Sequence, residues 1–292
     1  MSAPAIARPV VAASEGAFLR ALRRLLRHRL GRIGLTISMV VASAAAFSPW
    51  VAPFDPAGID YDTILGPPDG KYWLGTDEIG RDILSRIIEG ARVSIQVVFL
   101  AIALAFVAGS PIGLASGYFG GLVDDVFMRV MDGLLAFPIL VLALAIVAVL
   151  GPDLTNAMIA ITIVNVPGFA RLVRGQVLSI RELEFVQAAR ALGASDIRIM
   201  LRHILPSVIG NVIVYASLRA STALITESSL SFLGLGAQPP TPTWGGMLAT
   251  GMQYWDAWWM SVFPGVAIFL SALALNFLGD GLRDALDSRL QD

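Results

Sequence analysis

Apolar residues along this chain form six long stretches that are separated by shorter polar segments. A helix needs roughly 20 mainly apolar residues to cross the hydrocarbon core of a bilayer, and most of these stretches approach or exceed that length. The predicted spans cover residues 33–52, 93–116, 130–150, 157–169, 208–232 and 259–278, of which the fourth is the shortest. The pattern therefore predicts an all-α polytopic membrane protein with six transmembrane helices.

The polar segments divide the chain into tails, loops and a membrane core. The predicted parts are a cytosolic basic amphipathic tail (1–32), a first span (33–54), an extracytoplasmic loop with an interfacial helix (55–92), a core of five spans (93–281) that contains a polar loop (181–206), and a cytosolic C-terminal tail (282–292). In the first tail, leucines recur on one side of a helix predicted over residues 18–30, which would lie on lipid headgroups. In the interfacial helix, Thr76 is the expected N-cap, and pairs of Asp77 with Arg81 and of Asp82 with Arg86 are one turn apart.

The composition also points to a lipid-embedded chain. Of the 292 residues, 56% are hydrophobic and only 15% are charged, which is outside the usual balance of a soluble domain. Arginines gather before the first span and after the fourth, so the positive-inside rule places both regions and the C-terminus in the cytosol. A cleavable signal peptide is disfavoured because the 32-residue leading region and the 20-residue apolar stretch exceed its usual dimensions. Since there is no cysteine, disulfides and thiolate metal ligands are excluded.

A polar, helix-forming segment lies between the fourth and fifth spans. Good helix formers occupy residues 182–192, Gly193 can adopt the left-handed conformation that follows a helix, and a helical pattern resumes over residues 194–201. The small side chains of Ala188 and Ala189 leave a helix surface that can lie close to another protein. The segment therefore predicts a short helix pair in the cytosol.

This segment resembles the EAA loop of the permeases of ATP-binding-cassette (ABC) importers. That pattern is Glu-Ala-Ala, three residues, Gly, and after nine more Ile-x-Leu-Pro; here Gln187 replaces the Glu and His203 replaces the Ile, while the other positions fit. The resemblance implies that the loop is the coupling helix that docks on the ATPase subunit. The residues assigned to ATPase coupling are Glu184, Gln187, Ala188, Ala189, Arg190, Gly193, Ala194, Asp196, Leu205 and Pro206.

Two further segments, residues 74–94 and 227–248, resemble the corresponding parts of the C-type permease of dipeptide, oligopeptide and nickel importers. The resemblance implies a type I importer (MetI-like) permease fold in a bacterial plasma (inner) membrane, with both termini in the cytosol. It also implies a path for peptides delivered by a substrate-binding protein and coupled to ATP hydrolysis. Our hypothesis for the mechanism is alternating access, in which ATP-driven closure of the ATPase pair pulls the helices of residues 184–201 together and opens the path outward. The cargo stays open among dipeptides, oligopeptides, glutathione, nickel chelates and haem.

The same resemblance implies several partners: a second homologous permease of the B type, two ABC ATPase subunits or one fused ATPase, an extracytoplasmic substrate-binding protein and membrane lipid, with no nucleic acid. The chain has no Gly-x-x-x-x-Gly-Lys-Ser/Thr phosphate loop, so ATP and Mg are expected on the ATPase partners and no cofactor on this chain. The only histidines, His28 and His203, are too few for a His-rich metal centre. No serine has the histidine and carboxylate of a hydrolase, so we expect a transport subunit without catalytic residues rather than an enzyme.

Polar residues inside the predicted spans support a rival interpretation. Arg219 lies deep in the fifth span, where a charge needs a protein or water partner, and either Glu227 or Asn276 could approach it. The three residues form either a polar lock between helices or a charged lining of the translocation path. In the alternative function, an ion-coupled secondary transporter or channel, they would be the coupling groups.

Two other patterns concern helix packing and the outer surface. Gly109, Gly113 and Gly117 recur every four residues in the second span, which lets another helix backbone approach closely. Trp244 belongs to an aromatic cluster that is typical of an interfacial belt. A sharper hypothesis is that Trp244 shapes the mouth that faces the substrate-binding protein.

Overall fold

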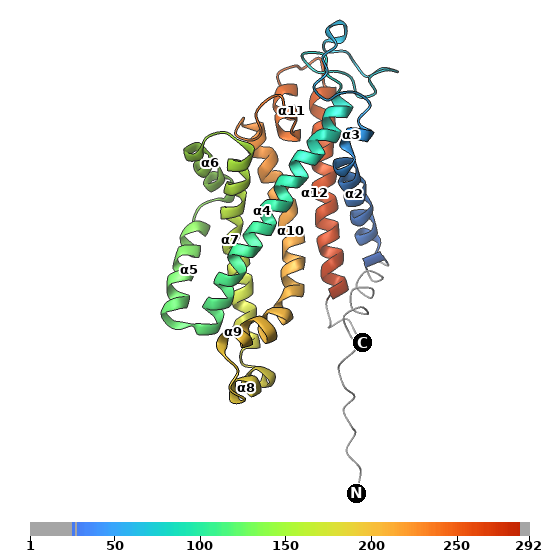
Figure 1. Ribbon diagram of the computed structural model, residues 1–292. Coiled ribbons are helices and arrows are strands. Elements are labelled where there is room, and N and C mark those ends of the chain that lie inside the picture. The colour runs from blue at the N-terminus through green and yellow to red at the C-terminus, as the bar shows by residue number, and fades with distance from the viewer. Residues whose placement is uncertain (1–24, 27, 287–292) are drawn as a thin grey trace.

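The computed structural model describes residues 25–26 and 28–286, arranged as a bundle of long helices (Figure 1). One end of the bundle carries irregular loops and α11 (Trp244–Gly251), and we call it the loop end. The other end carries α8 (Glu184–Ala191) and α9 (Asp196–Ile199), which together we call the helix pair. The tail helix predicted over residues 18–30 and the C-terminal tail fall largely outside the described residues.

The described ranges contain five helices that are long and apolar enough to cross a membrane, and a bent pair of helices provides a sixth span when its two parts are taken together. The long helices and the bent pair are α2 (Arg29–Ala46), α4 (Ile83–Phe119), α5 (Gly121–Leu135), α6 (Ile139–Leu150), α7 (Leu154–Ile180), α10 (Leu205–Phe232) and α12 (Trp259–Leu286). The remaining short elements are α3 (Ser48–Val51), η1 (Tyr61–Thr63) and η2 (Met200–Ile204). An all-helical polytopic fold is thus confirmed, and no β-strand occurs in the part of the chain that the structure describes.

The third predicted span, residues 130–150, is a bent pair of helices. Helices α5 and α6 meet at an angle of 92° instead of forming one rod. The break falls at Pro138, which has no N–H to donate and which disfavours a helical conformation at Phe137 before it. Similarly, the first predicted span is interrupted, because α2 ends at Ala46 and the short α3 follows.

The predicted start of the interfacial helix is wrong. Thr76 caps no helix: its hydroxyl donates to the carbonyl of Thr63 within the loop. The helix begins at Ile83, and the carboxylate of Asp82 caps it by accepting from the Ser85 amide at 2.8 Å. There is no separate interfacial helix, because α4 continues unbroken for 37 residues.

The ion pairs predicted for this segment change accordingly. Arg81 Nε lies 2.6 Å from Asp77 Oδ2, so that predicted pair is present, although it closes a loop rather than a helical turn. Arg86 does not pair with Asp82, because the Asp82 carboxylate accepts hydrogen bonds from Ser85. Instead, Arg86 Nε lies 3.4 Å from Asp77 Oδ2. The loop has thereby gathered two guanidinium groups around one carboxylate.

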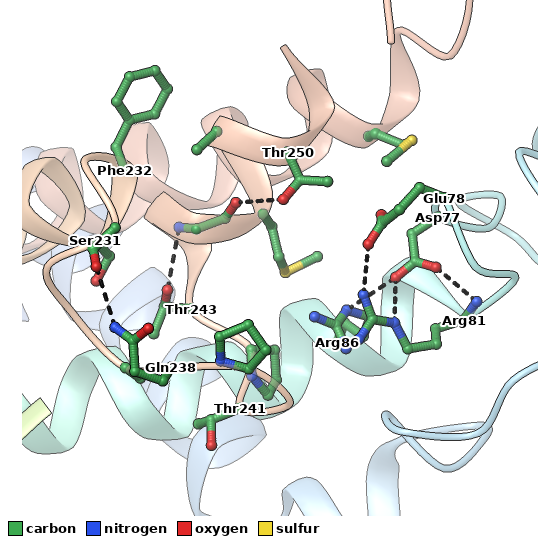
Figure 2. Close-up of a pocket in the computed structure, with 18 of the residues that line it drawn as sticks. Asp77, Glu78, Arg81, Arg86, Ser231, Phe232, Gln238, Thr241, Thr243 and Thr250 are labelled. Atoms are coloured by element: carbon green, nitrogen blue, oxygen red, sulfur yellow. Dashed lines mark hydrogen bonds and ion pairs between the residues drawn. The ribbon is translucent and has the colours of Figure 1, made fainter. Parts of the chain in front are cut away.

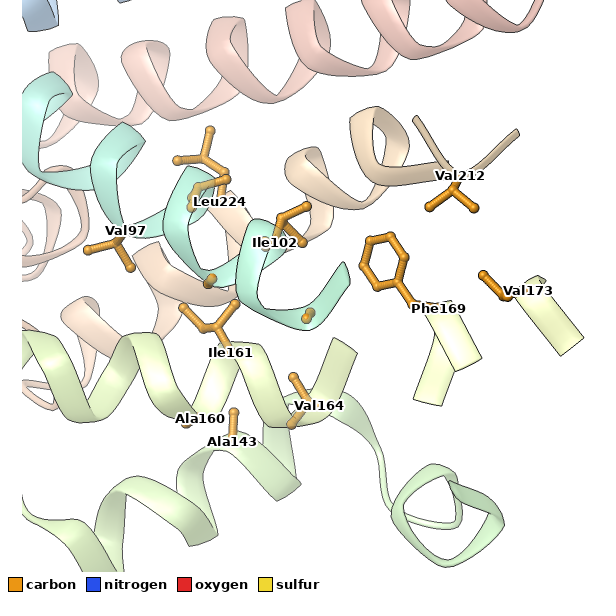
Figure 3. Close-up of a cluster of buried hydrophobic side chains, with 14 of the residues drawn as sticks. Val97, Ile102, Ala143, Ala160, Ile161, Val164, Phe169, Val173, Val212 and Leu224 are labelled. Carbon is orange, nitrogen blue, oxygen red and sulfur yellow. The ribbon is translucent and has the colours of Figure 1, made fainter. Parts of the chain in front are cut away.

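Helices α4 and α7 form the central contact of the bundle. Figure 3 shows side chains of α4, such as Val97 and Ile102, lying beside Ile161 and Val164 of α7, and the buried cluster extends to α6 and α10. The glycines of the second span lie against α7: a Cβ added at Gly113 would be 2.3 Å from the Ala170 carbonyl oxygen. The corresponding closest contacts are 2.6 Å at Gly109 and 2.8 Å at Gly117. Backbone contact this close requires residues without a side chain.

Candidate functional site

The helix pair has the local geometry that the sequence predicts. α8 ends at Ala191, Gly193 adopts φ +80°, and α9 begins at Asp196. α9 then continues through the π-helical turn η2 into α10, where Leu205 donates its N–H to the Met200 carbonyl immediately before Pro206. Because proline has no N–H, a wider turn at this point accommodates the missing hydrogen bond. The second half of the pair is therefore continuous with a membrane helix.

The residues predicted to couple to an ATPase lie mostly on the surface of this helix pair. The exposed ones are Glu184, Gln187, Ala188, Arg190, Gly193, Asp196 and Pro206, and the half-buried ones are Ala189, Ala194 and Leu205. Large apolar side chains accompany them, with Leu192 at 89% and Ile197 at 66% exposure. Beneath this surface, Val186 and Ile199 are fully buried, so the pair is attached to the bundle by an apolar contact.

Sequence reasoning missed Tyr118, which connects the helix pair to the end of α4. Its hydroxyl donates to Asp196 Oδ1 at 2.6 Å and accepts from Arg190 Nη2 at 3.3 Å. Tyr118 as a whole is 7% exposed. A tyrosine at the polar end of an apolar stretch is an amphipathic signal, but only the fold identifies its partners, which are more than 70 residues away.

Arginines near the helix pair hold helices together as well as marking one side of the membrane. Arg174 of α7 forms a bidentate ion pair with Asp124 of α5, with both N–O distances 2.5 Å. Arg171 of the same helix lies 2.5 Å from Asp132. Arg181 donates to the Gly117 carbonyl of α4 at 2.8 Å. The positive charges that predict the topology therefore also stabilise the packing at this end.

A cavity of about 600 Å³ opens at the loop end (Figure 2). One wall consists of charged residues at the start of α4, where Arg81 Nη2 donates to Glu78 Oε1 at 2.9 Å and Arg86 Nη1 donates to the Pro56 carbonyl at 3.1 Å. The opposite wall carries amide and hydroxyl groups, among them Gln238 and Thr241. The carboxylates and guanidinium groups balance one another, so the cavity is polar without net charge.

The loop beside this cavity is held by a second ionic cluster. Lys71 Nζ and the Tyr72 hydroxyl each lie 2.8 Å from Asp60 Oδ2. The hydrogen bond from Lys71, helped by that from Tyr72, lowers the pKa of Asp60 to about 2. The same bond with Asp60 raises the pKa of Lys71. Asp60 is therefore charged at neutral pH and acts as an anchor of the loop.

Trp244 does not face a partner, so the hypothesis that it shapes an outer mouth is wrong. The side chain is 1% exposed, and its Nε1 donates to the Ile87 carbonyl of α4 at 2.9 Å. Burial of the indole against α4 satisfies both its apolar surface and its N–H group. The exposed members of the aromatic cluster are Trp255 at 84% and Trp258 at 53%.

Arg219, Glu227 and Asn276 are not brought together. Arg219 Nε donates to the Tyr215 hydroxyl at 2.7 Å, and Glu227 is 1% exposed and accepts from the Ser231 hydroxyl at 2.8 Å. Asn276 is exposed. Within residues 25–26 and 28–286 no ion pair joins Arg219 to Glu227. The same described ranges contain no group of three residues able to hold a metal ion.

The described chain thus has the features of a polytopic helical transport subunit: a membrane bundle, a polar cavity at one end and an exposed helix pair at the other. Residues 109–292 match the family model for the binding-protein-dependent transport system inner membrane component. Residues 17–68 match the N-terminal TM domain of oligopeptide transport permease C. The chain belongs to this family and is a permease subunit of an ABC importer.

Similar proteins extend over nearly the whole length. The dipeptide transport system permease protein DppC of Alkalihalophilus pseudofirmus is 46% identical over 272 residues, which are 93% of this chain and 90% of the relative. The glutathione transport system permease protein GsiD of Escherichia coli O157:H7 is 44% identical over 271 residues, 92% of this chain and 89% of the relative. A chain in an inward-facing structure of the MetNI methionine ABC transporter, at 19% identity and a TM-score of 0.56, shares the fold over 69% of this chain and 97% of its own length.

Proposed function

We propose that this chain forms half of the translocation path of a peptide importer and that its helix pair transmits the work of separate ATPase subunits. The observation that carries this proposal is the exposed apolar surface of the helix pair, with Leu192 at 89% and Ile197 at 66% exposure. The pair projects from the end of the bundle, beyond the ends of its long helices (Figure 1). Exposed apolar groups gathered at one place in water mark a surface that another protein covers.

The small side chain of Ala188 also favours a surface on which another protein docks. Ala188 is exposed beside the large side chains, so the surface has a low point where a partner's backbone can approach. Val186 and Ile199, buried beneath it, connect a docked partner to the membrane helices. A displacement of the partner would therefore move the bundle.

The orientation follows from the arginines. Arg174, Arg181 and Arg190 lie at the helix-pair end, and the positive-inside rule assigns this end to the cytosol. Both termini then lie on the cytosolic side of a bacterial inner membrane, and the cavity at the loop end opens outside it. ATP and Mg bind to the ATPase partners, a second homologous permease of the B type completes the path, and a substrate-binding protein delivers cargo to the loop end.

Peptides are the cargo class that the named relatives support, since they comprise dipeptide and glutathione transport permeases. The polar, charge-balanced cavity at the loop end suits a zwitterionic solute better than an apolar one. Its volume of about 600 Å³ can accommodate a short peptide.

The test uses the absence of native cysteine. In the complete importer reconstituted in liposomes, Ala188→Cys should crosslink to the ATPase subunit, and peptide uptake should require ATP. The matched control is Tyr61→Cys, at a residue 75% exposed at the loop end, which should not reach the ATPase. Peptide uptake that follows an ion gradient without ATP, or crosslinking from Tyr61→Cys alone, would contradict the proposal.

A further inference from the structure

The hydroxyl of Tyr118 is a single point at which three helices meet. Tyr118 is the second-last residue of α4, Arg190 lies in α8, and Asp196 is the first residue of α9. The hydroxyl donates to Asp196 at 2.6 Å and accepts from Arg190 at 3.3 Å, while the Arg190 guanidinium lies 5.6 Å from the centre of the tyrosine ring. Across residues 25–26 and 28–286, these are the side-chain hydrogen bonds that join the helix pair to α4.

The bond to Asp196 is strong for a contact at the edge of the bundle. Its acceptor is a carboxylate, and hydrogen bonds to charged groups are shorter and stronger than those between neutral groups. Tyr118 is 7% exposed as a residue, which limits competition from water for its hydrogen bonds. Asp196 is itself exposed and lies in the first turn of α9, where the helix dipole favours its negative charge.

The other end of α4 forms part of the cavity at the loop end. Arg86 lines that cavity, and the Ile87 carbonyl accepts from Trp244 Nε1 at 2.9 Å. Between these residues and Tyr118, α4 is one uninterrupted helix, and its 37 residues span about 55 Å at the usual rise. α4, which contains Pro111, therefore connects Tyr118 to the wall of the cavity without a break (Figure 1).

We infer that Tyr118 is a positioning residue that passes the movement of the helix pair to α4 and so to the cavity at the loop end. The inference rests on the proposed function, because it names the helix along which movement driven by the ATPase reaches the cavity. The apolar anchors Val186 and Ile199 hold the helix pair on the bundle independently of the hydroxyl. Tyr118→Phe should therefore fold and assemble while the coupling between hydrolysis and transport is weakened.

The experiment compares ATP hydrolysis with peptide uptake in the reconstituted importer. Tyr118→Phe should leave hydrolysis within about twofold and lower the uptake per ATP about tenfold, the factor expected for one lost hydrogen bond to a charged group. The matched control is Tyr61→Phe, which removes the same hydroxyl at an exposed loop residue and should change neither quantity. A purely structural role would lower both quantities together through loss of assembled complex.

A second variant and a second measurement test the same hydrogen bond independently. Asp196→Asn keeps an acceptor oxygen and should reduce coupling less than Tyr118→Phe, and the double variant should resemble Tyr118→Phe alone because both changes act on one bond. Amide hydrogen exchange over residues 184–199 of the assembled complex should accelerate in Tyr118→Phe and stay unchanged in Tyr61→Phe.

The outcomes separate this inference from the proposed function. Wild-type uptake per ATP in Tyr118→Phe, with unchanged exchange in the helix pair, would overturn the role of Tyr118. A wild-type complex without ATP-dependent uptake would instead overturn the proposed function. Even then, the exchange rates would decide whether Tyr118 holds the helix pair to α4.

Discussion

Replacing Gly193 with valine tests whether the turn between α8 and α9 is needed for coupling. Gly193 has φ +80°, a conformation that L-residues with a side chain rarely adopt. A left-handed conformation costs roughly 1–2 kcal/mol for a residue with a Cβ, and a β-branched residue lies at the upper end. An added Cβ would meet nothing within 4 Å, so a steric clash contributes nothing to this cost.

A cost of roughly 1–2 kcal/mol shifts an equilibrium about 5- to 30-fold. Gly193→Val should therefore move α8 relative to α9 in most molecules, while the membrane helices, which do not contact this residue, stay folded. We expect ATP hydrolysis to continue in the reconstituted importer and peptide uptake to fall by about that factor. Gly193→Asn should retain most of the uptake, because asparagine tolerates the left-handed region.

The control for this prediction is Gly210→Val in α10. Gly210 also has open space around an added Cβ, but it is helical and has no positive φ, so the change tests the loss of a glycine alone. Uptake should be close to normal in this variant. Normal uptake by Gly193→Val would refute the argument from backbone conformation, and equal losses in both valine variants would show that the positive φ is not the cause.

Three further predictions concern stability. Gly113→Ala should destabilise the complex by about 1–3 kcal/mol, because an added Cβ would lie 2.3 Å from a carbonyl oxygen of α7. Gly175→Ala is the control: an added Cβ meets nothing within 4 Å there, so the change should be neutral or slightly stabilising. Thermal unfolding of the complex in detergent measures both effects. Trp244→Ala should cost about 3–5 kcal/mol and abolish assembly together with uptake; stable complex that lacks only uptake would contradict its structural role. Asp60, with a folded pKa of about 2, should stabilise its loop fully above pH about 4 and lose that contribution as the pH falls toward 2. The protection of the loop amides, measured as exchange relative to the intrinsic rate at each pH, should therefore fall over this interval more in wild type than in Asp60→Asn.

The elements that depend on local pattern are the ones that the sequence predicts. A membrane helix must satisfy its own backbone and present apolar side chains to lipid, so its position follows from apolar length alone. The turn at Gly193 follows equally from the order of helix formers and glycine. Both predictions use residues that are neighbours along the chain.

The predictions that were wrong depend on choices among competing partners, some near in the chain and some distant. Asp82 could pair with Arg86 or cap α4, and the cap prevails because Asp77 is available to Arg86. The sequence pattern around Trp244 predicts an aromatic residue at the membrane interface. In the structure its indole N–H donates to the carbonyl of Ile87, 157 residues earlier in the chain. The position of Trp244 cannot be predicted without knowing which loop returns to the start of α4.

The position of α4 explains why those distant contacts matter for function. In its first turns, Arg86 forms part of the cavity wall and the Ile87 carbonyl accepts from Trp244. In its last turn, Tyr118 donates to Asp196 of the helix pair. Its middle is locked to α7 through glycines that leave no room for a side chain, such as Gly113. Packing this close opposes sliding of α4 over α7, so we expect the two helices to move together. Movement of the helix pair would then tilt the two helices as a unit, and the cavity at the far end would change shape without any change within the helices themselves.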